Sequence, residues 1–467
     1  MSDQRSRRAL VWLCLGLCCL VGCRRVTPRS DLLWPEVALT PQDRVLVLAP
    51  HPDDESLACG GIIQQAVAQE IPVHVVFLTY GDNNQWSFAV YRKRPELGSK
   101  AVEGMGLVRH DEAIAAAGVL GLQADQLTFL GYPDFGTLNI WYAHWNDRPA
   151  FRSMFTRVTE VPYANAFRPG APYKGEEILA DLTTVLRDFK PTKVFLSHPA
   201  DHNPDHQSLY LFTRVAVWDL GSELEPELYP YLVHYPDWPT PKGYHPNDVI
   251  EPPSELVDQA SWQTLLLDRQ AVARKLTAVQ QHRTQYEVSR KFLTAFVRTD
   301  ELFGDLPVVP LQAGAPDVSL AAGGAISSTR TLDSLNETEQ AAFVGVEWRT
   351  VKLDGSDLVV SLDFSRPLAH DVRASVYVFG YRSDRPFPEM PKLHARLGEG
   401  SYAVFDQDRE LPADAWQIDR SAKQISLHLP LALLGDPQCL LIGARTYLGD
   451  VPLDWVSWRI LEVSACL

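Results

Sequence analysis

Basic residues are scarce in this chain: its 467 residues include 43 Lys and Arg against 58 Asp and Glu, a formal net charge of −15. A surface that binds nucleic acid needs a basic stripe that neutralises phosphates. The composition therefore predicts no nucleic acid partner. It names no other partner, because an acidic balance is compatible with many.

Internal repeats and low-complexity tracts are also missing from the chain. Apolar residues make up 46% of the composition and charged residues 22%, which is typical of a globular protein with enough material for a core. At roughly 150 residues per domain, the length predicts two or three domains.

Cysteine is rare outside the N-terminus, since four of the seven cysteines lie within the first 23 residues. In the remaining body, Cys59 is expected to be a small buried apolar residue. Cys439 and Cys466 lie near the ends of two predicted strands, and in an exported protein they could pair.

An apolar run from Ala9 to Val21 follows basic residues at positions 5, 7 and 8. The run is shorter than the roughly 20 residues of a transmembrane helix and suits a signal peptide. It ends in Leu-Val-Gly-Cys at Cys23, which resembles the lipobox of bacterial lipoproteins. The resemblance implies cleavage before Cys23 and a lipid anchor on that residue. An uncleaved anchor helix is the alternative.

Export follows from either interpretation of this leader, and the body would be held in the cell envelope. Arg24 stands directly after Cys23, where an Asp would signal retention in the inner membrane. In a cell with two membranes this favours the outer one, with the face unspecified.

Apolar runs typical of buried strands alternate with helical patterns between residues 44 and 207. Strands are expected at 44–50, 72–82, 127–136 and 192–198, and helices at 60–70, 109–122 and 175–190, the last followed by Pro191. This alternation predicts an α/β fold, with a Rossmann-like, mostly parallel sheet and helices on both faces. Ligands of such sheets bind beyond the carboxyl ends of the strands.

The second half of the chain differs from the first in composition and in its apolar pattern. A long helix is expected from Ser261 to Phe296, followed by a stretch rich in Pro, Gly, Ala, Ser and Thr, and then by short alternating runs that predict an all-β sandwich. The expected organisation is a signal peptide at 1–23, a linker at 24–43, an α/β domain at 44–302, a second linker at 303–340 and a β-sandwich at 341–467.

Two clusters of polar side chains follow two of the predicted strands. The first contains His51, Asp53, Asp54 and Glu55, and the second contains His198, Asp201, His202, Asp205 and His206. Helix capping would explain one Asp, but not two such clusters at equivalent strand ends. His51 and Asp54 are three residues apart and share one face of a helical turn. Because catalytic zinc takes three His, Asp or Glu ligands and keeps one position for water, we expect a metal site with its third ligand in the second cluster.

The segment "PHPDDE" at 50–55 resembles the signature of the LmbE-like, or PIG-L, zinc-dependent deacetylases. Further similarity lies in Arg109-x-x-Glu112-Ala113, in "FLGYPDFG" at 129–136 and in "PDH" at 204–206. "VHYPDWP" and the helix around Lys275 resemble late elements of the family. The resemblance covers roughly residues 44–296 and leaves out the β module.

The resemblance implies one Zn²⁺ per chain, held by His51, Asp54 and His206. Asp53 becomes the general base toward a water activated by the metal. Glu55 is expected to support this loop from behind the ligands, and Asp205 to orient an imidazole. The implied reaction is removal of an acyl group, commonly acetyl, from N-acetylglucosamine.

One departure from the family concerns its H-x-D-H motif, whose first His acts on the oxyanion or the leaving group. Asn203 stands in that place, and an amide donates a hydrogen bond but cannot shuttle a proton. His202 could take over, or His234 could serve. The alternative for His202 is an ordinary residue of a surface loop.

Arg109 and Asp134 resemble the family's substrate-binding pair, since a guanidinium and a carboxylate suit sugar hydroxyls. A salt bridge from Arg109 to Glu112 on the same helix is the alternative. The stripe formed by Lys275, Ala278, His282 and Gln285 is expected to serve packing and loop support rather than catalysis.

Aromatic residues crowd the irregular stretch 139–173. Trp141 and Trp145, together with Trp86, could form a rim that stacks on sugar; a lid packed for stability is the alternative. In the β module, Trp348, Trp416, Trp455 and Trp458 could stack on sugar or be buried in the core.

Three functions therefore remain open. The first is a tethered zinc hydrolase that deacetylates an N-acetylated amino sugar or glycoconjugate. The second is an amidase of another N-acyl conjugate. The third is a tethered carbohydrate-binding protein with an inactive metal site, an option that Asn203 keeps open.

Overall fold

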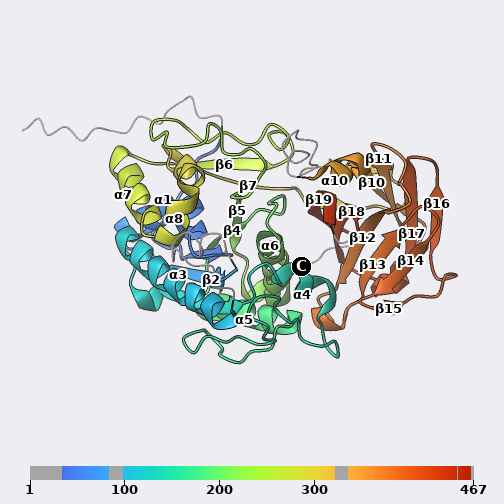
Figure 1. Ribbon diagram of the computed structural model, residues 1–467, viewed down its shortest axis with the longest axis horizontal. Coiled ribbons are helices and arrows are strands. Elements are labelled where there is room, and N and C mark those ends of the chain that lie inside the picture. Colours follow the sequence, from blue (N-terminus) through green and yellow to red (C-terminus); the bar gives the residue numbers. More distant parts are fainter. Residues whose placement is uncertain (1–33, 84–97, 321–334, 450, 464–467) are drawn as a thin grey trace, which may run out of the picture. The chain divides into compact units, whose positions relative to one another are not determined.

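Five parallel strands form the central sheet of the N-terminal region in the computed structural model, in the order β3–β2–β1–β4–β5 (Figure 1). The structure describes residues 34–83, 98–320, 335–449 and 451–463. The strands are β1 (Val45–Ala49), β2 (Val73–Thr79), β3 (Leu127–Tyr132), β4 (Lys193–Ser197) and β5 (Glu227–Tyr231). All residues of β1 and β4 are buried, as expected for central strands with the apolar sequences Val-Leu-Val-Leu-Ala and, within β4, Val-Phe-Leu.

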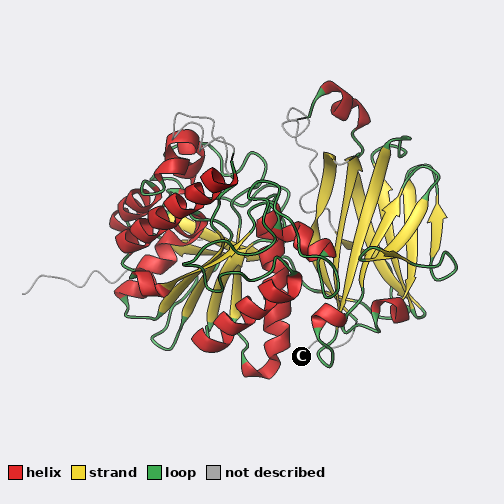
Figure 2. Ribbon diagram, turned by 60° about the horizontal axis from the view of Figure 1, so that its bottom comes forward, coloured by secondary structure: helices red, strands yellow, loops and turns green. Residues whose placement is uncertain are grey.

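Helices cover both faces of this sheet, as Figure 2 shows. They are α1 (Asp54–Ala68), α3 (Ser99–Leu120), α4 (Thr137–Ala143), α5 (Gly175–Phe189), α6 (Pro204–Leu220), α7 (Arg269–Val279) and α8 (Arg283–Leu293). Helices α1 and α3 pack against α7, while α5 packs against α6. On α5, Ile178, Leu182 and Val185 are buried at helical spacing. The predicted α/β architecture is confirmed.

The expected long helix from Ser261 to Phe296 is wrong. Ser261–Leu266 forms strand β6, which pairs antiparallel with β7 (Asp300–Asp305). Trp262 and Thr264 are buried while Ser261 and Gln263 are more exposed, an alternation typical of a strand. Asp268 then caps α7 by accepting the Ala271 N–H at 2.8 Å, and a break at His282 separates α7 from α8.

The C-terminal region contains two further sheets. One has five strands in the order β16–β17–β11–β10–β9 and the other has seven in the order β15–β14–β13–β12–β18–β19–β8. Their main strands are β10 (Val346–Asp354), β11 (Asp357–Phe364), β12 (Val372–Tyr381), β13 (Lys392–Leu397), β14 (Tyr402–Asp406), β15 (Arg409–Glu410), β16 (Gln417–Arg420), β17 (Gln424–Pro430), β18 (Cys439–Leu448) and β19 (Val451–Glu462). Side chains of both sheets share one buried apolar cluster, as a β-sandwich requires.

The segment expected as a linker at 303–340 contributes to the folded structure. Its first residues belong to β7; β8 (Val309–Pro310) pairs with β19 and β9 (Val318–Leu320) with β10. Short helix α10 (Glu337–Ala342) follows, capped by Asn336. Short strands escape a prediction from composition because backbone pairing, rather than apolar periodicity, holds them.

Trp141 and Trp145 do not form a sugar-binding rim, because both side chains are fully buried. The Trp141 ring lies 5.4 Å from the ring of Phe379 in β12 and 5.3 Å from that of Phe387. These tryptophans therefore belong to one apolar cluster that joins the α/β region to the seven-stranded sheet. Trp86 lies outside the described residues.

Several predictions for the chain ends lie outside the described residues. The signal peptide, Cys23 and the first half of the linker at 24–43 are among them, as is Cys466. Cys439 is disulfide-bonded, and Cys59 is buried with a free thiol. Within the described ranges, none of the helices combines the length and the apolar character needed to cross a bilayer.

Candidate metal centre

The two predicted polar clusters meet at the carboxyl ends of β1 and β4, which are neighbours in the sheet. The chain runs outward from β1 through β2 to β3 and then returns to the other side of β1 with β4. The carboxyl ends of β1 and β4 therefore lie at the topological switch point of the sheet, where ligands of such folds bind. His51 follows β1, and Asp54 is the first residue of α1. His206 lies in the first turn of α6, where Asn203 caps the helix and Pro204 opens it.

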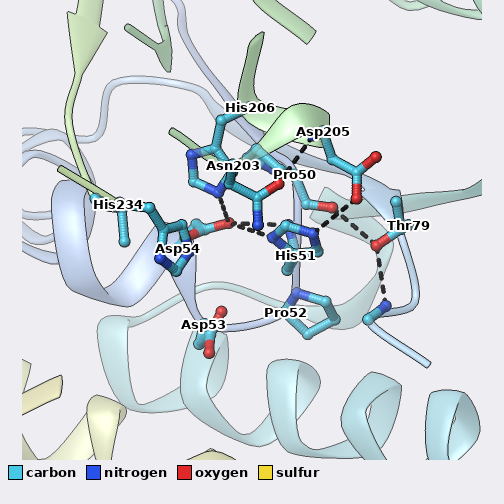
Figure 3. A network of polar contacts seen from close by, with 12 residues as sticks. Pro50, His51, Pro52, Asp53, Asp54, Thr79, Asn203, Asp205, His206 and His234 are labelled. Atoms are coloured by element: carbon cyan, nitrogen blue, oxygen red, sulfur yellow. Dashed lines mark hydrogen bonds and ion pairs between the residues drawn. The ribbon is translucent and has the colours of Figure 1, made fainter. Parts of the chain in front are cut away.

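His51, Asp54, His206 and His234 each offer one ligand atom, and these four atoms lie within 4.8 Å of one another (Figure 3). Oδ2 of Asp54 is central: Nδ1 of His51 lies 3.2 Å from it and Nε2 of His206 lies 3.1 Å from it. Ligand atoms about 2.0–2.1 Å from one tetrahedral centre lie about 3.3 Å apart. The spacing therefore fits joint coordination of a single cation.

Unpartnered polar atoms support the same conclusion. His206 is fully buried, and its Nε2, which faces Asp54, has no hydrogen-bond partner of acceptable angle among the described residues. Oδ1 of Asp54 is likewise buried without a partner in the described part of the chain. Buried polar atoms are nearly always satisfied, and a cation would satisfy these. The residues present therefore fit a divalent metal ion.

Carboxylates behind the imidazoles fix their orientation. Oδ2 of Asp201 lies 3.2 Å from Nδ1 of His206. Oδ2 of Asp205 lies 3.2 Å from Nε2 of His51, and Asp205 also accepts the backbone N–H groups of Phe135 and Thr137. Such carboxylates select the tautomer that presents the other ring nitrogen to a metal.

A second group of possible ligands shares His51, which also faces Asp134 and Asp205. Nε2 of His51 lies 3.2 Å from Oδ1 of Asp134. Asp205 is already engaged by Phe135 and Thr137, so we assign this side of the imidazole to hydrogen bonding and the Asp54 side to the metal.

Asp53 stands beside the ligands with a strained backbone, since its φ of 146° is rare for a residue with a side chain. Its backbone N–H donates to Oε2 of Glu55 at 3.0 Å. Oε1 of Glu55 lies 2.9 Å from Nε2 of His282, whose helix thereby supports the loop. Burial raises the pKa of Asp53 to about 6, although Arg109 opposes the rise.

Arg109 does not pair with Glu112. It donates to the carbonyl oxygens of Gly81 and Pro52, both at 2.7 Å, and its Nη2 lies 3.3 Å from Oδ2 of Asp53. Glu112 instead accepts from the N–H and hydroxyl of Thr284. The guanidinium therefore holds the strained loop and the Asp53 carboxylate together.

A cavity of about 870 Å³ opens onto these residues. Its lining includes His51, Asp53, Arg109, Asp134, Asn203, His234 and Gln285, together with Phe151, Met154 and Phe155 from the irregular stretch 139–173. A cavity of this size accommodates a sugar with its substituents.

Asn203 faces this cavity while its Oδ1 accepts the N–H of Asp205 at 2.8 Å. The amide nitrogen of Asn203 is the part of the group that can donate. Burial and the neighbouring His206 lower the pKa of His234 to about 4, so this imidazole is neutral at pH 7. The His202 side chain lines a different cavity.

Lys275 of the predicted support stripe is fully buried and pairs with Glu301 at 2.6 Å, and Glu301 accepts the N–H groups of Gly61 and Ile62. Asp201 and Thr137 hold the ligand-bearing elements, although neither has a separate role in the sequence prediction. Asp201 stood in the second cluster and could be found there, but Thr137 carries no local signal because only the fold brings it to Asp205.

Part of the chain is similar to known proteins in sequence and in fold. Residues 46–217 match the family model described as PIG-L: GlcNAc-PI de-N-acetylase. A 1D-myo-inositol 2-acetamido-2-deoxy-alpha-D-glucopyranoside deacetylase of Rhodococcus jostii is 26% identical over 186 residues, covering 39% of this chain and 56% of that protein. The enzyme of the same name from Actinosynnema mirum is 29% identical over 183 residues, covering 39% and 57%. The chain thus spans little more than half the length of these relatives.

Two solved structures are also similar. The N,N'-diacetylchitobiose deacetylase from Pyrococcus horikoshii has 20% identity and a TM-score of 0.32, covering 54% of this chain and 75% of that one. The A40926 pseudoaglycone deacetylase Dbv21 has 19% identity and a TM-score of 0.38, covering 56% and 96%.

Proposed function

Because residues 46–217 form a PIG-L family domain, we propose that this chain is a metal-dependent hydrolase that removes the acetyl group from an N-acetylated amino sugar or glycoconjugate. The observation that carries the proposal is the meeting of His51, Asp54 and His206 from two strand ends, with Asp53 beside them. Zinc is the proposed metal, since His and Asp ligands in this number suit a catalytic zinc site.

The metal would supply Lewis acidity, lowering the pKa of water and polarising the amide carbonyl. Asp53 takes the proton of the attacking water on a carboxylate oxygen and later delivers it to the leaving amine. Arg109 holds that carboxylate in place at 3.3 Å. The Asn203 amide and the neutral His234 ring face the same cavity and can donate to the developing oxyanion.

Substrate recognition is assigned to Asp134, which lines the same cavity beside His51. Asp134 accepts the backbone N–H of Asn83 at 2.9 Å on Oδ2, and its Oδ1 lies 3.2 Å from Nε2 of His51. Each carboxylate oxygen has a second lone pair that can accept a sugar hydroxyl. The relatives' names, which specify a 2-acetamido sugar, support an amino sugar over another N-acyl conjugate.

Export with a lipid anchor on Cys23 is part of the proposal, and the basic, apolar and Cys-ending leader supports it. The anchor would place the catalytic region in the cell envelope, where N-acetylated sugars occur in glycoconjugates.

The test is release of acetate from N,N'-diacetylchitobiose and from N-acetylglucosamine by the full chain, with added zinc and after chelation. The proposal expects release that the chelator abolishes and zinc restores. Release that persists after complete metal removal would overturn the metal-dependent mechanism. Failure on amino sugars together with release from simple N-acyl amino acids would favour the amidase alternative.

A further inference from the structure

A second cavity, of about 650 Å³, lies between the α/β region and the seven-stranded sheet. Phe135 and Asn139 line both this cavity and the one at the metal centre, so the two share a wall. Residues 36–467 form one compact unit, and the apolar cluster around Trp141 joins the two regions. The second cavity is therefore built by the fold, and a long substrate could occupy both.

Three arginines reach this second cavity from adjacent strands: Arg373 on β12, Arg396 on β13 and Arg445 on β18. Arg396 and Arg445 lie opposite Ser375 on either side of β12, so they stand in one row across the sheet. Arg373 is two residues from Ser375 and points to the same face. We name this lining the arginine cavity.

The arginine cavity concentrates positive charge in a chain of net charge −15. Its lining contains no Asp or Glu among the described residues. No ion pair joins Arg373, Arg396 or Arg445 to a carboxylate anywhere in the described ranges, although many other arginines of the chain are paired. Unpaired guanidinium groups gathered on one wall are a binding surface for anions.

The guanidinium group of Arg445 is preorganised for binding an anion. Its guanidinium carbon lies 5.3 Å from the ring centre of Tyr142, 5.4 Å from that of Tyr377 and 5.6 Å from that of Tyr447. The Tyr142 and Tyr377 rings themselves stack at 4.1 Å across the two regions. Nε of Arg445 is buried and has no hydrogen-bond partner in the described part of the chain. Aromatic faces thus fix the cation while leaving a donor unsatisfied.

His394 also lines the arginine cavity. Burial lowers the pKa of His394 to about 3, and Arg396 and Arg445 contribute to the drop. Its Nε2 lies 2.8 Å from the Ser375 hydroxyl, which in turn donates to the Tyr447 hydroxyl at 3.1 Å. The wall therefore combines fixed guanidinium groups with neutral polar groups, which suits an oxyanion.

We propose that the arginine cavity is a subsite for a phosphate or carboxylate group carried by the substrate, next to the amino sugar whose acetyl group lies at the metal centre. The inference rests on the proposed function and deepens it, because it assigns the β-sandwich a part in substrate selection. Guanidinium groups bind both anions through paired hydrogen bonds. The substrate class is thus an acidic N-acetylated glycoconjugate.

Three probes test this subsite: N,N'-diacetylchitobiose, its 1-phosphate, and the corresponding aldonic acid, which carry no charge, a phosphate and a carboxylate on the terminal residue, the aldonic acid also having that residue in open-chain form. The wild type should show a kcat/KM higher by about tenfold or more for at least one acidic probe, mainly through KM. This preference should shrink at high salt, where charge is screened. In R373Q/R396Q/R445Q the ratio of acidic to neutral kcat/KM should fall to about one.

Arg409→Gln is the matched control. Arg409 is an exposed arginine of the same sheet that pairs with Asp406 at 3.3 Å, so its loss removes one charge and should leave the ratio unchanged. Circular dichroism verifies that each variant is folded. Equal kcat/KM of the wild type for all three probes, or a preference that survives in the triple variant, would overturn the subsite.

Failure of the proposed function remains distinguishable from failure of the subsite. If no probe releases acetate, calorimetry measures binding of chitobiose 1-phosphate to the full chain directly. Binding at least tenfold weaker in the triple variant than in wild type supports the subsite; equal binding rejects it.

Discussion

At the scale of single residues, the central feature is the division of labour between adjacent aspartates. Asp54 faces both His51 and His206, whereas Asp53 turns the other way and meets Arg109. The unusual φ of Asp53 makes this divergence possible. One short stretch can therefore supply a metal ligand and a base.

Replacement of Asp53 by Asn tests this division. D53N should retain the metal stoichiometry of the wild type and lose about 10²–10⁴-fold in kcat, because an amide cannot accept the proton. Acetate release and metal analysis on the same preparation measure both quantities. Activity close to wild type, or loss of the metal, would contradict the assignment of Asp53 as base.

Metal removal should lower the stability of the fold by an amount that depends on pH. In the metal-free protein, burial opposes protonation of His206, but Asp201 and Asp54 outweigh it and raise the pKa of His206 to about 9. An unfolded His has a pKa of about 6.5. Because the folded pKa is the higher one, protonation stabilises the metal-free fold fully below pH 6.5. That stabilisation, at most about 3 kcal/mol, disappears as the pH rises through 9.

A bound cation takes the place of that proton, so metal affinity rises over the same window. The drop in Tm on chelation should therefore be larger at pH 9 than at pH 6.5. Differential scanning fluorimetry of matched samples with and without chelator gives this difference. A drop that is constant, or larger at pH 6.5, would show that His206 does not exchange a proton for a metal.

At the scale of elements, the sequence predicted best where burial alone decides the structure. The strands β1 and β4 and helix α5 follow from apolar runs and spacing that need no partner to interpret. The region from 261 to 296 failed because its apolar content fits a helix, while pairing with β7 makes its first part a strand. Such pairing is non-local and leaves no mark within the window itself.

The same limit applies to the aromatic stretch. An aromatic-rich loop after a site-bearing strand is compatible with a sugar rim or with a packed interface, and only the position of the β-sandwich decides between them. Trp141 belongs to the packed interface with the β-sandwich, because its ring centre lies 6.3 Å from that of Trp458 in β19. The metal ligands were predictable, by contrast, because a short motif carries them; Thr137 and the arginine cavity depend on tertiary contacts.

Trp141→Ala should therefore act on stability. Truncation of a buried Trp costs about 3–5 kcal/mol, so the variant should unfold at clearly lower denaturant concentration. Trp348→Ala is the matched control, because Trp348 is 57% exposed and its loss should change stability by no more than about 0.5 kcal/mol. Equal denaturation midpoints for W141A and the wild type would refute the interface role.

At the scale of the whole molecule, the proposal joins an anchor, a catalytic α/β region and a β-sandwich that selects acidic substrates. The acidic surface and the arginine cavity act in opposite senses: net charge −15 repels anions in general, while one cavity holds three arginines. Selectivity for an acidic conjugate then requires insertion of the charged group rather than loose attraction.

Anchoring at Cys23 is testable in cells. Cys23→Ser removes the atom that would carry the lipid, so the protein should move from the membrane fraction to a soluble fraction or retain an uncleaved leader. Fractionation and mass of the mature N-terminus give the answer. A C23S protein processed and membrane-bound like the wild type would contradict lipid anchoring.

Anomalous diffraction at the zinc edge, from crystals of the zinc-loaded full chain, locates the metal directly. We expect one strong peak per chain, within bonding distance of Nδ1 of His51, a carboxylate oxygen of Asp54 and Nε2 of His206. A peak held instead by Asp134 and Asp205, or no peak near His206, would contradict this expectation.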